Sequence, residues 1–368
     1  MPATIAIDAR PLVHQHSGIS IYLRELLSRL LTNREYRWVL YSDQPFPTES
    51  YAGHVLVRCG NRASRLGSSL FMQTHFPAWA KKDQVDLYWS PRHQVPLRLP
   101  TSIRRVVTLH DLVYEKHPET MTLQGRVLEN LLTPRSLQHA NRILTISESV
   151  QQELIARSPE LAERSRAIPL ASGIDEYDHS QHLTSDERYF IYCGSMEPRK
   201  NLDRLIQAFL ALKTGSNPPP QRFVLVTGGG WKNTKTLALI ATHPEHFIVH
   251  EKITEAEKAA LIAHSDFLVL PSIYEGFGIP IVEALKLGRA VLTSNVGAMK
   301  EVVGPAGLLV DPHDEKSLRQ ALLRLCTDEN LRTKLSSKAR KQAERFSWNR
   351  TADLTQQALD EALAETPH

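Results

Sequence analysis

The nine residues Glu275-Gly276-Phe277-Gly278-Ile279-Pro280-Ile281-Val282-Glu283 join a predicted strand, Phe267–Pro271, to a helical stretch, Ile281–Leu287. Two glycines let the backbone turn tightly and approach a ligand, and Pro280 suits a first helical position because its missing N–H would have no partner there. Free N–H groups at a helix start attract anions, and the helix dipole adds to the attraction. The segment therefore predicts a strand–loop–helix unit of an α/β fold with a diphosphate site at the helix start.

The two carboxylates of this segment have separate predicted roles. Glu283 is about one helical turn into the helix, whereas Glu275 precedes the loop. A carboxylate can accept paired hydrogen bonds from a diol, so one glutamate would bind a ribose and the other a transferred sugar. The alternative is an ordinary capped helix whose glutamates face water.

Short apolar runs alternate with amphipathic stretches along the whole chain, which is typical of parallel sheets flanked by helices. A chain of 368 residues also favours two domains. We expect two series of strands, at Thr4–Asp8, Trp38–Ser42, Val55–Arg58, Leu87–Ser90, Arg105–His110 and Arg142–Ile146, then at Tyr189–Gly194, Phe223–Gly228, Phe247–Glu251, Phe267–Pro271, Ala290–Ser294 and Gly307–Val310. This pattern predicts two doubly wound, Rossmann-like sheets.

The predicted domains are residues 1–172 and residues 185–346. The polar stretch Pro169–Ser180 lacks periodicity and is interpreted as the linker or the end of the first domain. A last helix, at 348–364, is expected to pack back on the first domain.

A second candidate site follows the first strand of the second domain, in Gly194-Ser195-Met196-Glu197-Pro198-Arg199-Lys200-Asn201. Ligands bind open sheets at the carboxyl ends of their strands, where Arg199 and Lys200 would neutralise a pyrophosphate leaving group. The chain has no Asp-x-Asp pair, so we expect no carboxylate-bound metal ion. The alternative is an exposed pair of basic residues at a helix start.

In the first domain, His110 ends a predicted strand and Asp111 begins the next loop. The histidine is a candidate for binding the sugar or the acceptor, with Asp111 fixing its tautomer or binding separately. A single histidine at a strand end is also often packed or solvated. Gly18 lies in the first strand-to-helix turn, where backbone can approach a phosphate, but no Gly-x-Gly-x-x-Gly fingerprint is present, which argues against a dinucleotide-dependent dehydrogenase.

Composition predicts an ordinary globular protein in a reducing compartment. Three widely spaced cysteines form no Cys-x-x-Cys pair, and no apolar run reaches the length of a membrane span. We therefore expect a cytoplasmic protein without a metal or a cofactor.

Between Tyr51 and His110, nine basic residues stand against two acidic ones, a local net charge of +7. Apolar residues are interleaved with this basic 58–105 region, which suggests contact with an anionic membrane surface or a lipid phosphate. The alternative is a solvated basic face over core residues. No stacking module or recognition helix indicates nucleic acid.

Together, these segments resemble the retaining glycosyltransferases of family 4, which have the GT-B fold of two Rossmann-like domains facing across a cleft. The resemblance rests on the Gly18 turn, His110-Asp111, Gly194–Asn201, the Glu-x7-Glu element and Ser294–Gly304. Family members often have a Gly-Gly pair where this chain has Ser17-Gly18, which puts a phosphate contact at Ser17 in doubt.

The resemblance also implies roles for individual residues. Glu275 would hold the transferred sugar, Glu283 the ribose, and Arg199 and Lys200 the diphosphate, with His110 approaching the sugar. Backbone N–H groups of Phe277, Gly278 and Ile279 would face the sugar or the phosphates. No general base is needed, since the leaving phosphate is thought to accept the proton of the acceptor.

The Thr-Leu-His-Asp-Leu run and Ser294–Gly304 look most like bacterial mannosyltransferases of lipopolysaccharide O-antigen or surface polysaccharide synthesis. This likeness implies a GDP-mannose or related GDP-deoxyhexose donor and a lipid-linked oligosaccharide acceptor, with the protein peripheral on the inner face of the membrane. The competing hypotheses are a sugar-nucleotide epimerase of the same fold and an inactive carbohydrate-binding or scaffolding relative.

Overall fold

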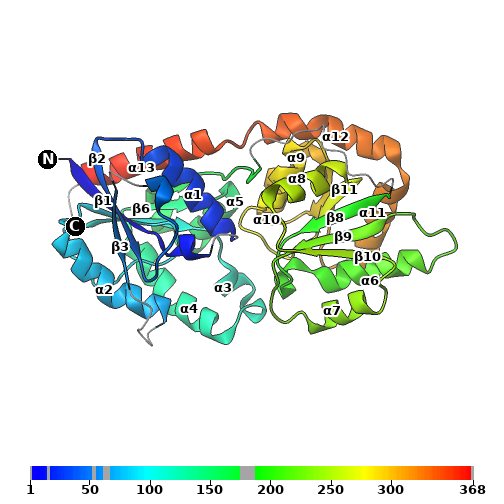
Figure 1. Cartoon of the computed structure of the whole chain (residues 1–368), viewed down its shortest axis with the longest axis horizontal. Helices are drawn as coiled ribbons and strands as arrows, with labels where there is room; N and C mark the ends of the chain where they lie inside the picture. The colour runs from blue at the N-terminus through cyan, green and yellow to red at the C-terminus, as the bar shows by residue number, and fades with distance from the viewer. Residues whose placement is uncertain (1, 15–16, 52–54, 61–66, 175–186, 366–368) are drawn as a thin grey trace. The chain divides into compact units, whose positions relative to one another are not determined.

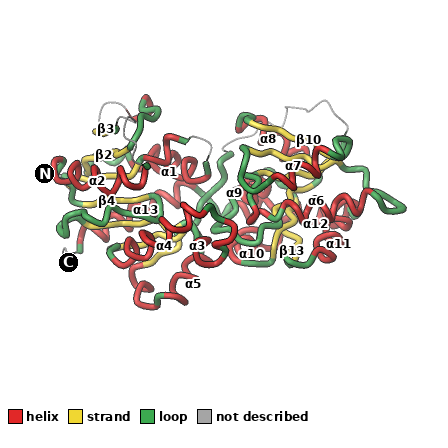
Figure 2. The backbone as a smooth tube through the Cα atoms, turned by 90° about the horizontal axis from the view of Figure 1, so that it is seen from below, coloured by secondary structure: helices red, strands yellow, loops and turns green. Residues whose placement is uncertain are grey.

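The computed structural model describes residues 2–14, 17–51, 55–60, 67–174 and 187–365. The chain forms two compact units, one of residues Met1–Leu170 and Trp348–His368 and the other of residues Ala171–Ser347. In each unit, helices cover both faces of a central sheet (Figures 1 and 2). None of the helices in the described part of the chain combines the length and apolar character needed to cross a bilayer.

The first unit contains a seven-stranded parallel sheet with the order β3-β2-β1-β4-β5-β6-β7. Its strands are β1 (Ala3–Asp8), β2 (Tyr36–Ser42), β3 (Val55–Cys59), β4 (Leu87–Ser90), β5 (Arg104–Leu109), β6 (Arg142–Thr145) and β7 (Ser165–Ala167). Its helices are α1 (Gly18–Leu30), α2 (Ser68–Lys82), α3 (Val113–Lys116), α4 (Leu123–Gln138), α5 (Glu148–Arg157) and α13 (Trp348–Ala364), with 3-10 turns η1 (Arg10–Val13), η2 (Glu49–Tyr51), η3 (Pro118–Thr120) and η4 (Pro159–Arg164).

The second unit contains a six-stranded parallel sheet with the order β10-β9-β8-β11-β12-β13. Its strands are β8 (Tyr189–Cys193), β9 (Arg222–Thr227), β10 (Phe247–Glu251), β11 (Phe267–Leu270), β12 (Ala290–Ser294) and β13 (Gly307–Val310). Its helices are α6 (Leu202–Lys213), α7 (Thr234–Ala241), α8 (Glu255–His264), α9 (Ile279–Lys286), α10 (Gly297–Val303), α11 (Glu315–Thr327) and α12 (Glu329–Ala343), with 3-10 turns η5 (Pro198–Lys200) and η6 (Gly304–Ala306).

All twelve predicted strands are present, and their ends differ from the prediction by at most two residues. Strands buried on both faces read as nearly continuous apolar runs, which is why they are easy to recognise. The edge strand β7 was not predicted, because its residues Ser-Arg-Ala are half-buried and have no apolar pattern. The predicted doubly wound α/β architecture is therefore confirmed.

The last helix, α13, belongs to the first unit. The ring of Trp348 lies 6.4 Å from that of Tyr22 on α1, and the hydroxyl of Thr351 donates to the carbonyl of Pro169 at 2.6 Å. Near the other end of the helix, Asp360 accepts a hydrogen bond from the Tyr36 hydroxyl at 2.7 Å. The helix is thus tied to the first sheet and to α1. The predicted linker lies outside the described residues from Asp175 onward.

The basic 58–105 region does not form one free surface. Arg58 is paired with the buried Asp83, and Arg104 and Arg105 donate to backbone carbonyls. Burial favours the neutral form of Asp83, but hydrogen bonds from Arg58 and Tyr41 outweigh it and lower the pKa of the carboxyl group. Arg62 and Arg65 lie outside the described residues. Part of the charge counted in the sequence therefore serves the fold.

Candidate active site

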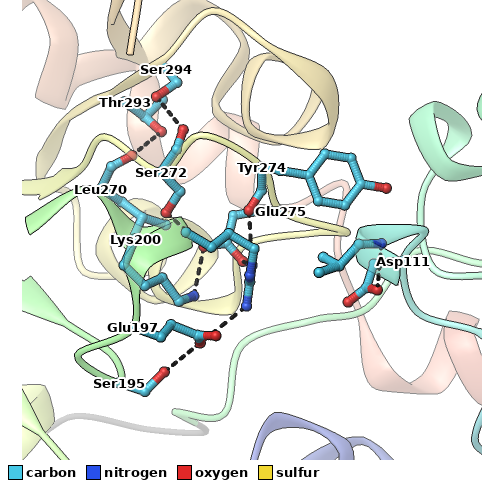
Figure 3. A network of polar contacts seen from close by, with 12 residues as sticks. Asp111, Ser195, Glu197, Lys200, Leu270, Ser272, Tyr274, Glu275, Thr293 and Ser294 are labelled. Carbon is cyan, nitrogen blue, oxygen red and sulfur yellow. Dashed lines mark hydrogen bonds and ion pairs between the residues drawn. The ribbon is translucent and has the colours of Figure 1, made fainter. Parts of the chain in front are cut away.

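Glu275 lies beyond the carboxyl end of β11 and is held by three donors (Figure 3). Its Oε1 accepts hydrogen bonds from Lys200 Nζ at 2.6 Å and from the hydroxyl of Ser272 at 2.7 Å, and its Oε2 accepts one from Arg199 at 2.6 Å. Burial alone would raise the pKa of Glu275, but the two cations lower it to about 2. The group is therefore a fixed carboxylate at neutral pH.

Arg199 lies between two carboxylates. Besides Glu275, it donates to Glu197 Oε1 at 3.2 Å and to the carbonyl of Tyr274 at 2.8 Å. Glu197 is fixed in turn by the hydroxyl of Ser195 at 2.7 Å (Figure 3). The predicted basic pair, Arg199 and Lys200, thus belongs to a charge-balanced cluster with Glu197 and Glu275 and is not an exposed surface pair.

The backbone after Lys200 explains how the pair is held. Asn201 has a left-handed φ of 61°, and its side-chain amide donates to the carbonyls of Pro271 at 3.0 Å and Pro312 at 2.8 Å. A non-glycine residue in this conformation is strained and needs such compensation. The amide ties the η5 turn to the end of β11, which brings Arg199 and Lys200 to Glu275.

Helix α9 begins at Ile279, two residues before the predicted start. Gly278 precedes it with φ of 99°, a conformation that disfavours any side chain. Among the described residues, none accepts a hydrogen bond from the N–H groups of Phe277, Gly278 or Ile279. These donors are thus available at the helix start, as predicted for an anion site.

Glu283 lies one turn into α9 and is 1% exposed. Its Oε1 accepts a hydrogen bond from Lys258 at 2.8 Å, whereas its Oε2 is buried and has no hydrogen-bond partner among the described residues. Burial raises the pKa of Glu283, against the effect of Lys258. A buried acceptor without a partner costs about 1–3 kcal/mol, and this oxygen is able to accept a hydrogen bond from a ligand.

His110 follows β5 in the first unit and is neutral at pH 7. Its Nε2 lies 2.8 Å from the carbonyl of Pro91, which can only accept, so Nε2 carries the proton and Nδ1 is an acceptor. Burial and the neighbouring His93 lower the pKa of His110 to about 4. The tautomer is set by Pro91 instead of the predicted Asp111, which accepts a hydrogen bond from the N–H of Val113 at 3.1 Å.

His93 and Glu129 were not found by sequence reasoning. The backbone N–H of His110 donates to Nε2 of His93 at 3.1 Å, and Nδ1 of His93 lies 3.3 Å from Glu129 Oε2. Because Nε2 accepts a hydrogen bond here, Nδ1 of His93 carries a proton directed to Glu129. Burial alone would lower the pKa of His93, but the carboxylate of Glu129 raises it. The only sequence signal was the place of His93 just after β4, at the same sheet edge as His110.

Gly18 is the first residue of α1, and the hydroxyl of Ser17 caps this helix by accepting a hydrogen bond from the N–H of Ser20 at 3.1 Å. The structure thus brings Glu275, Arg199 and Lys200 together, with the α9 start and Glu283 in the same unit. His110 and Gly18 belong to the other unit. Within the described residues, no group of three or more His, Cys, Asp or Glu side chains is arranged to hold a metal ion.

The family models that match the chain describe glycosyltransferases, and the names of its relatives agree with them. Residues 174–342 match the family model described as glycosyl transferases group 1, and residues 16–175 match that of glycosyltransferase family 4. The chain is 29% identical to the O-antigen chain mannosyltransferase B of Escherichia coli, over 94% of this chain and 96% of that protein. It is also 30% identical to the MMP alpha-(1->4)-mannosyltransferase of Mycolicibacterium hassiacum, over 60% of this chain and 54% of the relative.

Among solved structures, the sucrose-phosphate synthase of Thermosynechococcus elongatus superposes with a TM-score of 0.78 at 19% identity, covering 98% of this chain and 99% of that one. At this identity the likeness concerns the fold alone. It agrees with the predicted GT-B fold.

Proposed function

Because the chain belongs to the glycosyltransferases of family 4, we propose that it transfers mannose or a related deoxyhexose from a GDP-linked donor. The proposed acceptor is a lipid-linked oligosaccharide in the synthesis of lipopolysaccharide O-antigen or another surface polysaccharide. The names of the mannosyltransferase relatives support this choice of sugar and pathway. The observation that carries the proposal is the carboxylate of Glu275, fixed by Arg199, Lys200 and Ser272 beside the start of α9.

In the proposed mechanism, Arg199 and Lys200 bind the diphosphate of the donor, with the N–H groups of Phe277, Gly278 and Ile279 completing the site. These cations take the place of a metal ion, so the reaction needs none. A carboxylate has about four acceptor positions. Three are filled at Glu275, so one remains for a hydroxyl of the transferred sugar. The unpartnered oxygen of Glu283 accepts from the ribose.

His110 contributes from the first unit as a neutral imidazole. Its Nδ1 is an acceptor, so the ring can bind a sugar hydroxyl without adding positive charge. The bond to the leaving phosphate breaks, the acceptor oxygen attacks the same face of the sugar, and its proton passes to the phosphate. The configuration at the transferred carbon is therefore retained.

Donor specificity is tested by measuring the thermal shift with GDP, UDP and ADP, followed by transfer assays with the matching sugar nucleotides. A ligand at 100 times its Kd adds about 2.7 kcal/mol to the free energy of unfolding. GDP is expected to give the largest shift and GDP-mannose or a GDP-deoxyhexose to be turned over. Turnover confined to UDP-sugars would contradict the proposed donor. An epimer accumulating without acceptor would instead identify a sugar-nucleotide epimerase.

A lipid-linked acceptor requires contact with the cytoplasmic face of a membrane, and α4 has a suitable surface. Leu123, Val127 and Leu131 recur every fourth residue along α4 and are 78%, 57% and 48% exposed. Residues at this spacing lie on one face of a helix. Arg126 and Arg135 are also exposed on this helix. Apolar residues beside arginines fit an anionic bilayer surface.

Cosedimentation with vesicles of phosphatidylglycerol and phosphatidylcholine tests this contact. Val127→Asp is expected to lower the bound fraction severalfold, because it places a charge in the apolar stripe. Leu237→Asp on α7, at a leucine that is 45% exposed, serves as the matched control and should bind like wild type. Equal binding of both variants would contradict a role for α4.

A further inference from the structure

The loop after β4 holds His110 at two points. The carbonyl of Pro91 accepts a hydrogen bond from Nε2 of His110 at 2.8 Å, and Nε2 of His93 accepts one from the backbone N–H of His110 at 3.1 Å. Among the described residues, no other acceptor for this N–H is found. The rings of Tyr22 and His110 pack edge to face, with 5.4 Å between their centroids. The place of the His110 ring therefore depends on where this loop lies.

Helix α4 fixes the loop through Glu129. Oε2 of Glu129 accepts hydrogen bonds from Nδ1 of His93 at 3.3 Å and from the hydroxyl of Thr133, one turn further along α4. The side chains of His93 and Glu129 are only 13% and 19% exposed. Burial favours the neutral form of Glu129, but His93 and Thr133 outweigh it and lower the pKa of Glu129 to about 2. Glu129 is therefore a carboxylate at neutral pH.

This carboxylate determines which nitrogen of His93 carries the proton. A carboxylate can only accept, so it keeps the proton of His93 on Nδ1 and leaves Nε2 as the acceptor for His110. Both ring nitrogens of His93 are thus used within the protein. His93 can influence a substrate only through His110.

We propose that Glu129 and His93 are positioning residues, which hold His110 where its Nδ1 can accept a hydrogen bond from a sugar hydroxyl. This inference rests on the proposed function and adds two residues to it. The link runs from α4 through one imidazole ring to the backbone of His110.

Protonation of His93 would break this link. A histidinium has an N–H group at both nitrogens, so Nε2 could no longer accept from the N–H of His110. Burial and Arg92 lower the pKa of His93, but Glu129 and Asp111 outweigh both and raise it above its ordinary value. The pKa of His110 is about 4. As the pH falls, His93 is therefore protonated before His110, and kcat should decline with it.

The first test measures kcat between about pH 5 and about pH 9, with the sugar nucleotide found active in the donor panel. In Glu129→Gln, the acidic decline of kcat is expected to move to lower pH, because the carboxylate that raises the pKa of His93 is gone. In His93→Gln, the amide oxygen can accept from the N–H of His110 without titrating. This variant should retain most of the wild-type kcat and lose the acidic decline above about pH 5.

The second test is a double-mutant cycle. His93→Phe keeps a ring but removes the acceptor, so kcat is expected to fall about ten- to hundredfold, as when a catalytic group is displaced by about 1 Å. The same change in a His110→Ala enzyme should have little further effect, because residues that act through one another are not additive.

Ser136→Ala is the matched control. It removes a hydrogen bond at 3.0 Å between α4 and the N–H of Val95 in the same loop, but neither residue forms a hydrogen bond with His110. This variant should keep the wild-type kcat and pH profile.

An unchanged acidic decline in Glu129→Gln, or equal losses from His93→Phe in both backgrounds, would overturn the inference. If His93→Phe is unstable in thermal melts, the pH profiles of His93→Gln and Glu129→Gln decide. Failure of wild type to transfer sugar from any donor would count against the proposed function. Transfer by wild type with the same pH profile in every variant would count against the positioning role alone.

Discussion

Glu275 and Glu283 are two buried glutamates of one short segment, and their surroundings differ in nearly every respect. Glu275 accepts three hydrogen bonds, two of them from cations, and its pKa is about 2. Glu283 has one cationic partner, one oxygen without a partner, and a raised pKa. The hydrogen bonds of Glu275 are thus largely made within the protein, whereas Glu283 keeps one buried oxygen that can accept a hydrogen bond from a ligand.

The largest expected effect is that of Glu275→Gln. Removing one partner of a buried ion pair costs about 3–5 kcal/mol, because the remaining cations are left uncompensated. Loss of a preorganised electrostatic group typically lowers kcat by about 10²–10³-fold. We expect both effects, measured by chemical unfolding and by steady-state transfer assays. A stable variant with normal kcat would show that Glu275 is not the fixed sugar-binding group.

Glu283→Gln should mainly weaken donor binding. A hydrogen bond to a charged group contributes about 1.5–3 kcal/mol, so the Kd of GDP is expected to rise about ten- to hundredfold. Stability should change less than in Glu275→Gln, because Lys258 keeps its contact with Glu255 at 2.6 Å. Calorimetric titration with GDP measures the change. Equal losses of kcat and donor affinity in both variants would remove the distinction between the two glutamates.

The two glutamates should also give opposite pH dependences of stability. The pKa of Glu275 is lowered from 4.5 to about 2, so its contribution of about 3 kcal/mol is present above pH 4.5 and is lost as the pH falls towards 2. The pKa of Glu283 is raised, so its carboxylate destabilises the fold at neutral pH, and protonation relieves this cost as the pH falls.

Unfolding of wild type and both glutamine variants between pH 7 and pH 3 tests this expectation. The advantage of wild type over Glu275→Gln should shrink as the pH falls. Relative to Glu283→Gln, wild type should gain stability instead. Parallel curves for the two differences would contradict the assigned pKa shifts.

The smallest expected effect is that of Ser272→Ala, which removes one neutral donor from Glu275 and leaves both cations in place. A neutral hydrogen bond contributes about 0.5–1.5 kcal/mol, so kcat should fall only a fewfold, with donor affinity unchanged. Ser265→Ala is the matched control, because this buried serine donates only to a backbone carbonyl, that of Ile262. An equal loss of kcat in the control would mean that the effect is structural.

The sequence was sufficient for the fold because its determinants are local. Apolar runs such as Phe267–Leu270 mark buried strands, and Gly278 with Pro280 marks the start of α9. The same local pattern placed Glu275 and Glu283 near a helix start. The prediction was least accurate where the signal is weak, as in β7.

Long-range pairing was not predictable in this way. Arg199 and Glu275 are 76 residues apart, so nothing in the spacing shows that the predicted phosphate ligands are paired with the predicted sugar ligand. His93 and Glu129 are 36 residues apart and belong to no recognisable pattern. Such contacts depend on which strand ends meet at one edge, and side-chain packing decides them only after the sheet has formed.

All the hydrogen-bond partners described for Glu275 and Glu283 come from residues 171–347. In the proposed mechanism, the residues that bind the nucleotide part of the donor thus lie in one half of the polypeptide, whereas His110 belongs to the other. Natural selection, or an engineer building chimeras, can therefore exchange the first half for another and change the acceptor while keeping the donor. A fold built this way lets enzymes diversify one substrate at a time.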